Sequence, residues 1–75
     1  MTADLGDLVD LLAERRRRQG LSQTEIAARM RTSQSAVARL ESGGGDVRLS
    51  TLQRYAAALG HTLQLGVTAV EADDA

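Results

Sequence analysis

The chain has 75 residues, with a single aromatic residue, no cysteine, no proline and a net charge of −1. This length allows one small domain, and the lack of cysteine excludes disulfides and thiolate metal sites. No run of about 20 apolar residues is present, and Asp4, Asp7 and Asp10 lie where a signal peptide would be basic. We expect a cytoplasmic domain with an aliphatic core, without a membrane segment, metal or cofactor.

The charges are segregated along the chain. Six of the ten acids lie in the two ends, whereas residues 11–70 hold nine arginines and four acids, a net charge of +5. A basic central region indicates an anionic partner such as nucleic acid. The acidic residues 71–75 are expected to form a disordered tail.

Apolar residues near the N-terminus repeat at helical spacing and predict a helix over about residues 4–19. Those expected to face inward are Leu5, Leu8, Val9 and Leu12. Acids in the first turn and arginines in the last turn suit the helix dipole. Gly20 is expected to end this helix in a left-handed conformation.

A second helix is predicted over residues 22–30. Ser22 is the expected N-cap and Glu25 its reciprocal capping partner, while Leu21 and Ile26 are spaced to form a hydrophobic staple. The expected inward-facing residues are Ile26, Ala27 and Met30. A turn at residues 31–33 follows.

A third helix is predicted over residues 34–42, with Val37 and Leu40 facing the core. Its outer face is polar and short-chained, formed by Gln34, Ser35, Ala38, Arg39 and Ser42. Two short helices separated by a turn form a helix-turn-helix over about residues 22–42.

The glycines at 43–45 end the third helix, and a fourth helix is predicted to reach Leu59 and to end at Gly60. Ser50 is the expected N-cap, with Gln53 at the capping-box position. Tyr55 repeats with the apolar residues of this helix, so we expect it in the core and not stacked on a base.

The apolar period then changes from 3.6 to 2, and Leu63, Leu65 and Val67 predict a half-buried β-strand over residues 62–68. A lone strand needs a partner for its backbone groups. We expect two such strands from two copies to pair as an antiparallel ribbon, which makes these three residues the dimer interface. The alternative is a tail packed on the helices of a monomer. The expected organisation is a DNA-binding domain at 1–61 and a dimerisation strand at 62–70.

An exposed helix with short polar side chains can enter the major groove of duplex DNA, where all four base pairs are distinguishable. Gln34 is placed to bind adenine N6 and N7, and Arg39 to bind guanine O6 and N7. Ser35 is a further base contact, and Ala38 is placed to touch a thymine methyl. These four residues are the expected base readers.

Phosphate contacts are expected from helix N-termini, loop amides and arginines around the same helix. The candidates are Gln23, Arg31, Ser33, Gly44, Arg48 and Thr51. The triple glycine has an alternative role as a helix stop and linker only.

Residues 8–60 resemble the XRE family of helix-turn-helix proteins, the lambda-repressor and Cro-like domains of phages and bacteria. The resemblance rests on Leu-Ser-Gln at 21–23, on the run from Ser33 to Gly43 and on Leu-x-x-Tyr-Ala-x-Ala-Leu-Gly at 52–60. It implies an all-α, four-helix fold in which the helix beginning at Ser33 and Gln34 reads DNA. It also implies a phosphate contact at Gln23 and a buried pair between Arg16 and Glu41.

The sequence departs from this family at two places. Arg31 stands where the family usually has glycine with a positive φ, and a strand replaces the fifth helix of many members. The ending resembles that of small regulators and antitoxins of toxin–antitoxin operons.

The sequence therefore predicts a nucleoid-associated repressor, autoregulatory, that binds a pseudo-palindromic double-stranded operator as a homodimer. An enzyme is excluded because one histidine and no cysteine provide no convergent catalytic set, and His61 is expected to be an exposed turn residue. The alternative function is an antitoxin that also neutralises a small toxin protein. The operator sequence, the sign of regulation and any inducer stay open.

Overall fold

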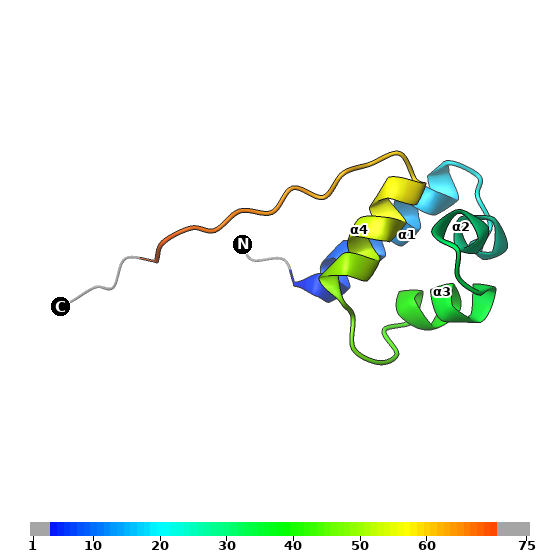
Figure 1. Cartoon of the computed structure of the whole chain (residues 1–75), viewed down its shortest axis with the longest axis horizontal. Helices are drawn as coiled ribbons and strands as arrows, with labels where there is room; N and C mark the ends of the chain where they lie inside the picture. The colour runs from blue at the N-terminus through cyan, green and yellow to red at the C-terminus, as the bar shows by residue number, and fades with distance from the viewer. Residues whose placement is uncertain (1–3, 71–75) are drawn as a thin grey trace.

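Four α-helices make up the folded part of the chain in the computed structural model, which describes residues 4–70 (Figure 1). They are α1 (Leu5–Arg18), α2 (Gln23–Met30), α3 (Gln34–Glu41) and α4 (Leu49–Ala58). α4 packs against α1 and α2, and α3 packs across α1 and α2. The all-α, four-helix fold predicted from the sequence is confirmed. Within residues 4–70, none of the helices has the length and hydrophobicity needed to cross a lipid bilayer.

The starts of α1 and α2 are fixed by reciprocal side-chain caps. At α2, the Glu25 N–H donates to Ser22 Oγ over 3.0 Å, and the Ser22 N–H donates to Glu25 Oε1 over 3.1 Å. Hydrogen bonding from Ser22 also lowers the pKa of Glu25. Asp4 and Asp7 form the same arrangement at α1, which the sequence reasoning did not identify. The predicted capping box of the second helix is confirmed.

The predicted N-cap of the fourth helix is wrong. α4 begins at Leu49, with Arg48 as an N-cap that makes no side-chain hydrogen bond, and Ser50 lies inside the first turn. The Leu52 N–H donates to the Arg48 carbonyl over 3.1 Å, and this turn holds Leu52 completely buried. Burying a leucine contributes about 1.5–3 kcal/mol, more than the roughly 1 kcal/mol of a typical serine cap.

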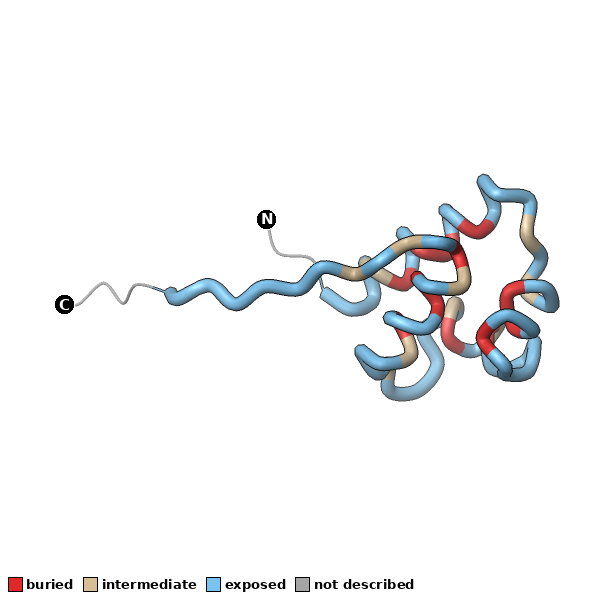
Figure 2. Tube along the Cα trace, turned by 45° about the horizontal axis from the view of Figure 1, so that its top comes forward, coloured by how far each residue is buried: buried red, intermediate tan, exposed pale blue. Residues whose placement is uncertain are grey.

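The core is aliphatic apart from Tyr55, and every helix contributes to it (Figure 2). Its members are Val9, Leu12, Ile26, Ala27, Met30, Val37, Leu40, Leu52, Tyr55, Ala56 and Leu59. The core position predicted for Tyr55 is confirmed, with 1% of the residue exposed. Leu5 departs from the inward position expected for it, because the first turn of α1 leaves it 39% exposed.

The turn between α2 and α3 has the left-handed conformation expected of the helix-turn-helix, without a glycine. Arg31 adopts φ 58° and ψ 46°, while its N–H donates to the Ala28 carbonyl over 3.1 Å. The next amide, of Thr32, donates to the Ala27 carbonyl over 2.9 Å and closes the turn. A residue with a Cβ is disfavoured here by about 1–2 kcal/mol.

Replacing Arg31 with glycine should therefore stabilise the protein. We expect the free energy of unfolding to rise by about 1 kcal/mol, or the melting temperature by about 4–8 °C, because the Cβ clash disappears. Thermal unfolding followed by circular dichroism measures this. Arg31→Ala is the matched control, since it removes the guanidinium and keeps the Cβ. An equal gain in both variants would contradict strain as the cause.

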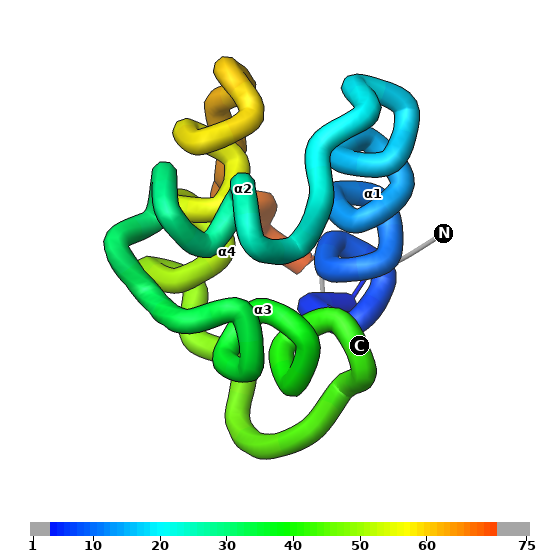
Figure 3. The backbone as a smooth tube through the Cα atoms, turned by 90° about the vertical axis from the view of Figure 1, so that its right-hand side faces the viewer, coloured from blue at the N-terminus to red at the C-terminus, as the bar shows by residue number. Residues whose placement is uncertain are grey.

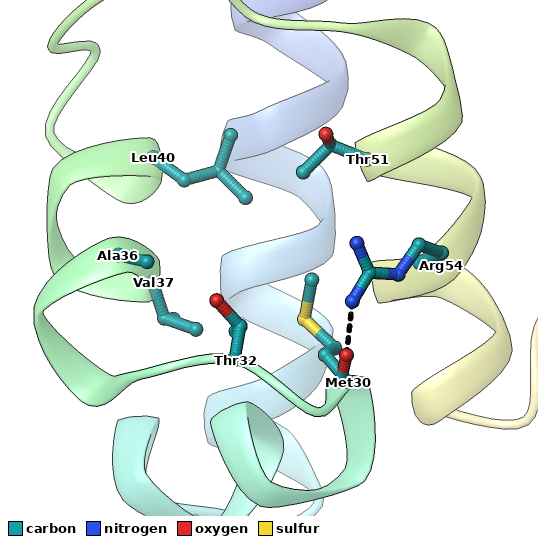
Figure 4. A pocket seen from close by; sticks show the side chains of 7 residues that line it. All are labelled: Met30, Thr32, Ala36, Val37, Leu40, Thr51 and Arg54. Atoms are coloured by element: carbon teal, nitrogen blue, oxygen red, sulfur yellow. Dashed lines mark hydrogen bonds between the residues drawn. The ribbon is translucent and has the colours of Figure 1, made fainter.

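Two arginines tie the C-terminal ends of α2 and α4 together. Arg54 of α4 donates to the carbonyl of Met30, the last residue of α2 (Figure 4), and Arg29 of α2 donates to the carbonyl of Ala58, the last residue of α4, over 3.2 Å. Each arginine satisfies a carbonyl that its partner helix leaves free. Above the Arg54 contact, α3 and α4 enclose a small hollow of about 220 Å³. The two hydrogen bonds join α2 to α4 at one end of this hollow.

The strand predicted at residues 62–68 is not formed within this single chain. Residues 61–70 leave the end of α4 as an irregular segment that runs away from the helices (Figure 1). Leu63 packs against the chain's own core, whereas Leu65 and Val67 are 55% and 103% exposed. Strand structure requires a hydrogen-bonded neighbour, and residues 4–70 supply none. The predicted acidic tail at 71–75 lies outside the described residues.

His61, at the start of this segment, was predicted to be exposed, but it is half-buried. Its Nδ1 lies 3.0 Å from the Leu59 carbonyl oxygen, and its Nε2 lies 3.5 Å from Arg15 Nη1. The imidazole thus packs between the ends of α4 and α1. This arrangement fixes where the C-terminal segment leaves the helices.

Candidate nucleic-acid interface

α3 buries one side and leaves the other side open. Val37 and Leu40 are in the core, and the four residues predicted to read bases share the opposite side. Gln34, Ser35 and Arg39 are exposed and Ala38 is half-buried. Figure 3 shows α3 below α2, with the loop at 42–48 at the lower edge of the same face. The local fold therefore presents these side chains together.

Behind this face lies an ion pair between α1 and α3. Arg16 Nε and Nη2 donate to the two carboxylate oxygens of Glu41 over 2.8 and 3.0 Å. The side chains are only 10% and 8% exposed, and Arg16 Nη1 also donates to the Leu21 carbonyl over 2.7 Å. The buried pair that the family resemblance implied is thus present and bidentate.

Glu41 is the centre of a larger hydrogen-bond network. It also accepts hydrogen bonds from the Tyr55 hydroxyl and, over 3.0 Å, from Gln23 Nε2. Burial alone would raise the pKa of Glu41, but hydrogen bonds from Arg16, Tyr55 and Gln23, with the charge of Arg16, lower it below the usual value. Burial and the bond to Glu41 raise the pKa of Tyr55. The carboxylate is held ionised in the interior.

The network continues from Glu41 to the outer face. Gln23 Oε1 accepts a hydrogen bond from Gln34 Nε2 over 2.7 Å, so the first side chain of α3 is anchored through α2 to the buried pair. With Tyr55 from α4, all four helices contribute to this network. The sequence reasoning missed the contact between the two glutamines. Helical spacing indicates only that Gln34 and Glu41, seven residues apart, lie on one face of α3, and it does not indicate the contact with α2.

Arg39 lies across the glycine loop. A Cβ on Gly44 would come within 3.0 Å of Arg39 Cγ, and one on Gly45 within 3.3 Å of Arg39 Nη2. The Gly44 N–H donates to the Arg39 carbonyl over 2.9 Å, and the Gly43 N–H to the Leu40 carbonyl over 3.2 Å, which closes α3 with a Schellman motif. The phosphate contact predicted for the Gly44 amide therefore competes with this cap, and the glycines make room for Arg39.

The remaining phosphate candidates are spread over the ends of three helices. Ser33 caps α3, where its Oγ accepts the Ala36 N–H over 3.1 Å. Arg48 is exposed before α4, and Thr51 is half-buried in its first turn. Arg31 lies apart from them, at the end of α2 opposite Gln23, around a hollow of about 320 Å³ that Arg29 and Arg54 also line. Two of the candidates contact a predicted base reader through their side chains: Gln23 accepts a hydrogen bond from Gln34, and Ser33 Oγ lies 3.2 Å from Ser35 Oγ.

The three arginines among the predicted DNA contacts carry charge that no acidic side chain of the described residues compensates. Within residues 4–70 the ion pairs are Arg16 with Glu41 and, on the surface of α1, Arg18 with Glu14. Arg31, Arg39 and Arg48 form no ion pair with a described residue. Their charge is available to an anionic partner.

Comparison with known proteins agrees with this geometry. Residues 12–66 match the helix-turn-helix family. Over 58 residues the chain is 48% identical to antitoxin HigA1 of Mycobacterium tuberculosis strain CDC 1551 / Oshkosh, and equally to that of strain ATCC 25618 / H37Rv. The match covers 77% of this chain and 39% of each relative. Less than half of each relative's length therefore has a counterpart here.

Proposed function

We propose, from the premise that this chain belongs to the XRE-type helix-turn-helix family, that it is a repressor that reads operator DNA with α3. The observation that carries the proposal is the outer side of α3, where the exposed Gln34 is anchored to the interior and the exposed Arg39 has no acidic partner among the described residues. A helix of this shape fits the major groove.

In this proposal Gln34 binds adenine N6 and N7, while Arg39 binds guanine O6 and N7. Ser35 and Ala38 lie between them on the same side and contact the neighbouring bases. Gln23 has one N–H left after its bond to Glu41, and this proton is available to a phosphate oxygen. Arg48 and the free amides at the start of α4 take the phosphates on the other side of the groove.

We further propose that two copies pair through residues 62–68. Support comes from the side chains of Leu65 and Val67, which the single chain leaves uncovered, and from their alternation with polar residues. An antiparallel ribbon would cover both and place two α3 helices on half-sites about 34 Å apart. The operator is then pseudo-palindromic, and the protein's own promoter is the proposed place for it.

Selection from a pool of random duplexes tests DNA reading directly. The expected result is enrichment of one pseudo-palindrome whose half-sites contain adenine and guanine within the same groove segment. Footprinting on the DNA upstream of the gene should then protect that sequence. Equal affinity for every duplex would overturn sequence reading, and no binding at low salt would overturn DNA binding itself.

Arg39→Ala should cost roughly 1–3 kcal/mol of binding free energy on the selected site and relax the preference at one base pair, because a bidentate guanine contact is lost. Titrations with the selected site and its single-base variants measure both quantities. Arg48→Ala is the control. It should weaken every duplex alike and reduce the salt dependence by about one unit of slope, as expected for a phosphate contact. Uniform weakening by Arg39→Ala would reassign Arg39 to phosphate.

The relatives favour a second function. Both are named antitoxins and share 48% of the aligned residues with this chain, so we propose as the alternative that it also neutralises a toxin. The test is genetic: an adjacent gene should encode a small protein that arrests growth, and co-expression of this chain should relieve the arrest. Without such a neighbour, the chain is a repressor only.

A further inference from the structure

The side-chain amide of Gln34 has a donor end and an acceptor end, and the end that it offers to DNA decides which base it fits. An amide nitrogen carries two protons, and an amide oxygen only accepts. In the structure, Gln34 Nε2 donates one of its protons to Gln23 Oε1 over 2.7 Å. The free groups are therefore one N–H and the carbonyl oxygen.

The orientation of Gln34 is determined two side chains away. A carboxylate has no proton to donate, so Gln23 has to turn its NH₂ group toward Glu41, and Nε2 lies 3.0 Å from Glu41 Oε1. Gln23 Oε1 then faces Gln34, which has to respond with its own NH₂ group. Rotating the Gln23 side-chain amide by half a turn would place its carbonyl oxygen against the Glu41 carboxylate. This rotation would break the hydrogen bonds of Gln23 with Glu41 and with Gln34.

Glu41 itself has no freedom to turn or to gain a proton. Both of its oxygens are occupied, one by Arg16 Nε and the Tyr55 hydroxyl and the other by Arg16 Nη2 and Gln23. The side chain is 8% exposed, and its pKa is lowered by these partners. Glu41 therefore accepts hydrogen bonds, and does not donate them, at neutral pH. It is the first member of a relay of side chains that runs from Glu41 through Gln23 to Gln34.

We propose that Glu41, without touching DNA, is a positioning residue that makes Gln34 select adenine over guanine. Adenine presents one donor, N6, and one acceptor, N7, in the major groove, and these match the free oxygen and N–H of Gln34. Guanine presents two acceptors, O6 and N7, and would need the reversed amide with both protons free. This inference rests on the proposed role of Gln34 as a base reader.

The experiment compares the full chain with three variants on two duplexes. The duplexes carry adenine or guanine at the position where Gln34→Ala removes the preference. Glu41→Gln lets the relay run in either direction, and Gln23→Met breaks it while leaving the pair between Arg16 and Glu41 in place. Tyr55→Phe is the matched control, because it removes a hydrogen bond of the same network and keeps the carboxylate.

The unchanged protein and Tyr55→Phe should favour adenine by roughly 5- to 150-fold, the range of one good bidentate contact. In Gln23→Met and Glu41→Gln the ratio should fall to within about threefold, whatever happens to overall affinity. The inference is overturned if folded Glu41→Gln or Gln23→Met prefers adenine over guanine as strongly as the unchanged protein does. A guanine preference in the unchanged protein also overturns it. If Glu41→Gln does not fold, Gln23→Met decides alone.

A second measurement needs no DNA. In the free protein, one side-chain amide proton of Gln34 should give a shifted NMR resonance with slowed exchange, present in Tyr55→Phe and lost in Gln23→Met. Absence of this signal in the unchanged protein overturns the relay. Absence of any sequence preference, with the NMR signal present, overturns the proposed DNA reading instead, so the two failures are distinguishable.

Discussion

Replacing Arg16 with methionine is expected to lower the free energy of unfolding by about 3–5 kcal/mol, the cost of breaking a buried ion pair from one side. The Glu41 side chain is only 8% exposed, so the substitution leaves a buried carboxylate without its bidentate partner. It also removes the hydrogen bond that Arg16 donates to the Leu21 carbonyl. A small domain has only about 5–15 kcal/mol in total. Urea titration should show a largely unfolded protein at moderate denaturant.

The same substitution two residues further along provides the control. Arg18 lies 3.0 Å from Glu14, but these side chains are 74% and 53% exposed, so Arg18→Met should change stability by at most about 1 kcal/mol. A comparable loss in both variants would show that the cost comes from removing any α1 arginine, and that burial of the pair is not its cause.

The buried pair also predicts sensitivity to acid. The pKa of Glu41 in the folded protein lies below its ordinary value of 4.5, so its contribution is fully present above that pH and is lost as pH falls through the lowered pKa. Stability should therefore decline below about pH 4.5. In Arg16→Met this decline should shrink, because much of the stabilisation of the ionised form is gone. An unchanged acid profile in that variant would contradict the assignment.

The helices that the sequence predicted best are those with local start and stop signals. α2 and α3 begin after Ser22 and Ser33, whose side chains cap them, and both signals involve residues only a few positions apart. α4 was placed too late because its start depends on burying Leu52 against other helices, and this packing has no local signature. Packing outweighed the serine cap at that site.

In the candidate site, too, the features set by local sequence were predicted and those set by contacts between helices were not. Helical spacing sufficed to place Gln34 and Arg39 on the exposed side of α3, because a period of 3.6 fixes which residues share a face. The contact between Gln34 and Gln23 could not be derived like this, since it joins two helices and depends on side-chain torsions. Arg31 shows a further limit: the turn has the left-handed geometry that the family usually gives to a glycine, although the residue here is arginine.

Deleting residues 62–75 is expected to convert the protein from dimer to monomer and to weaken binding to the full operator by roughly 10²- to 10⁴-fold, the usual gain from linking two binding modules. Binding to an isolated half-site should change little, because Gln34 and Arg39 belong to the helical part. Light scattering and titrations with full and half-sites measure the two effects. Since Leu63 packs on the core, unfolding should be measured alongside.

Substitutions on one face of the segment separate pairing from this loss of packing. Leu65→Lys with Val67→Lys places charges on the face proposed to be covered in the ribbon, and both positions are exposed in the single chain, so its own fold should not suffer. The pair Gln64→Lys with Thr68→Lys adds the same charge to the opposite face, because strand residues alternate. Only the first pair should yield monomers. A truncated chain that stays dimeric, or equal effects of both lysine pairs, would place the dimer contact elsewhere on the helices.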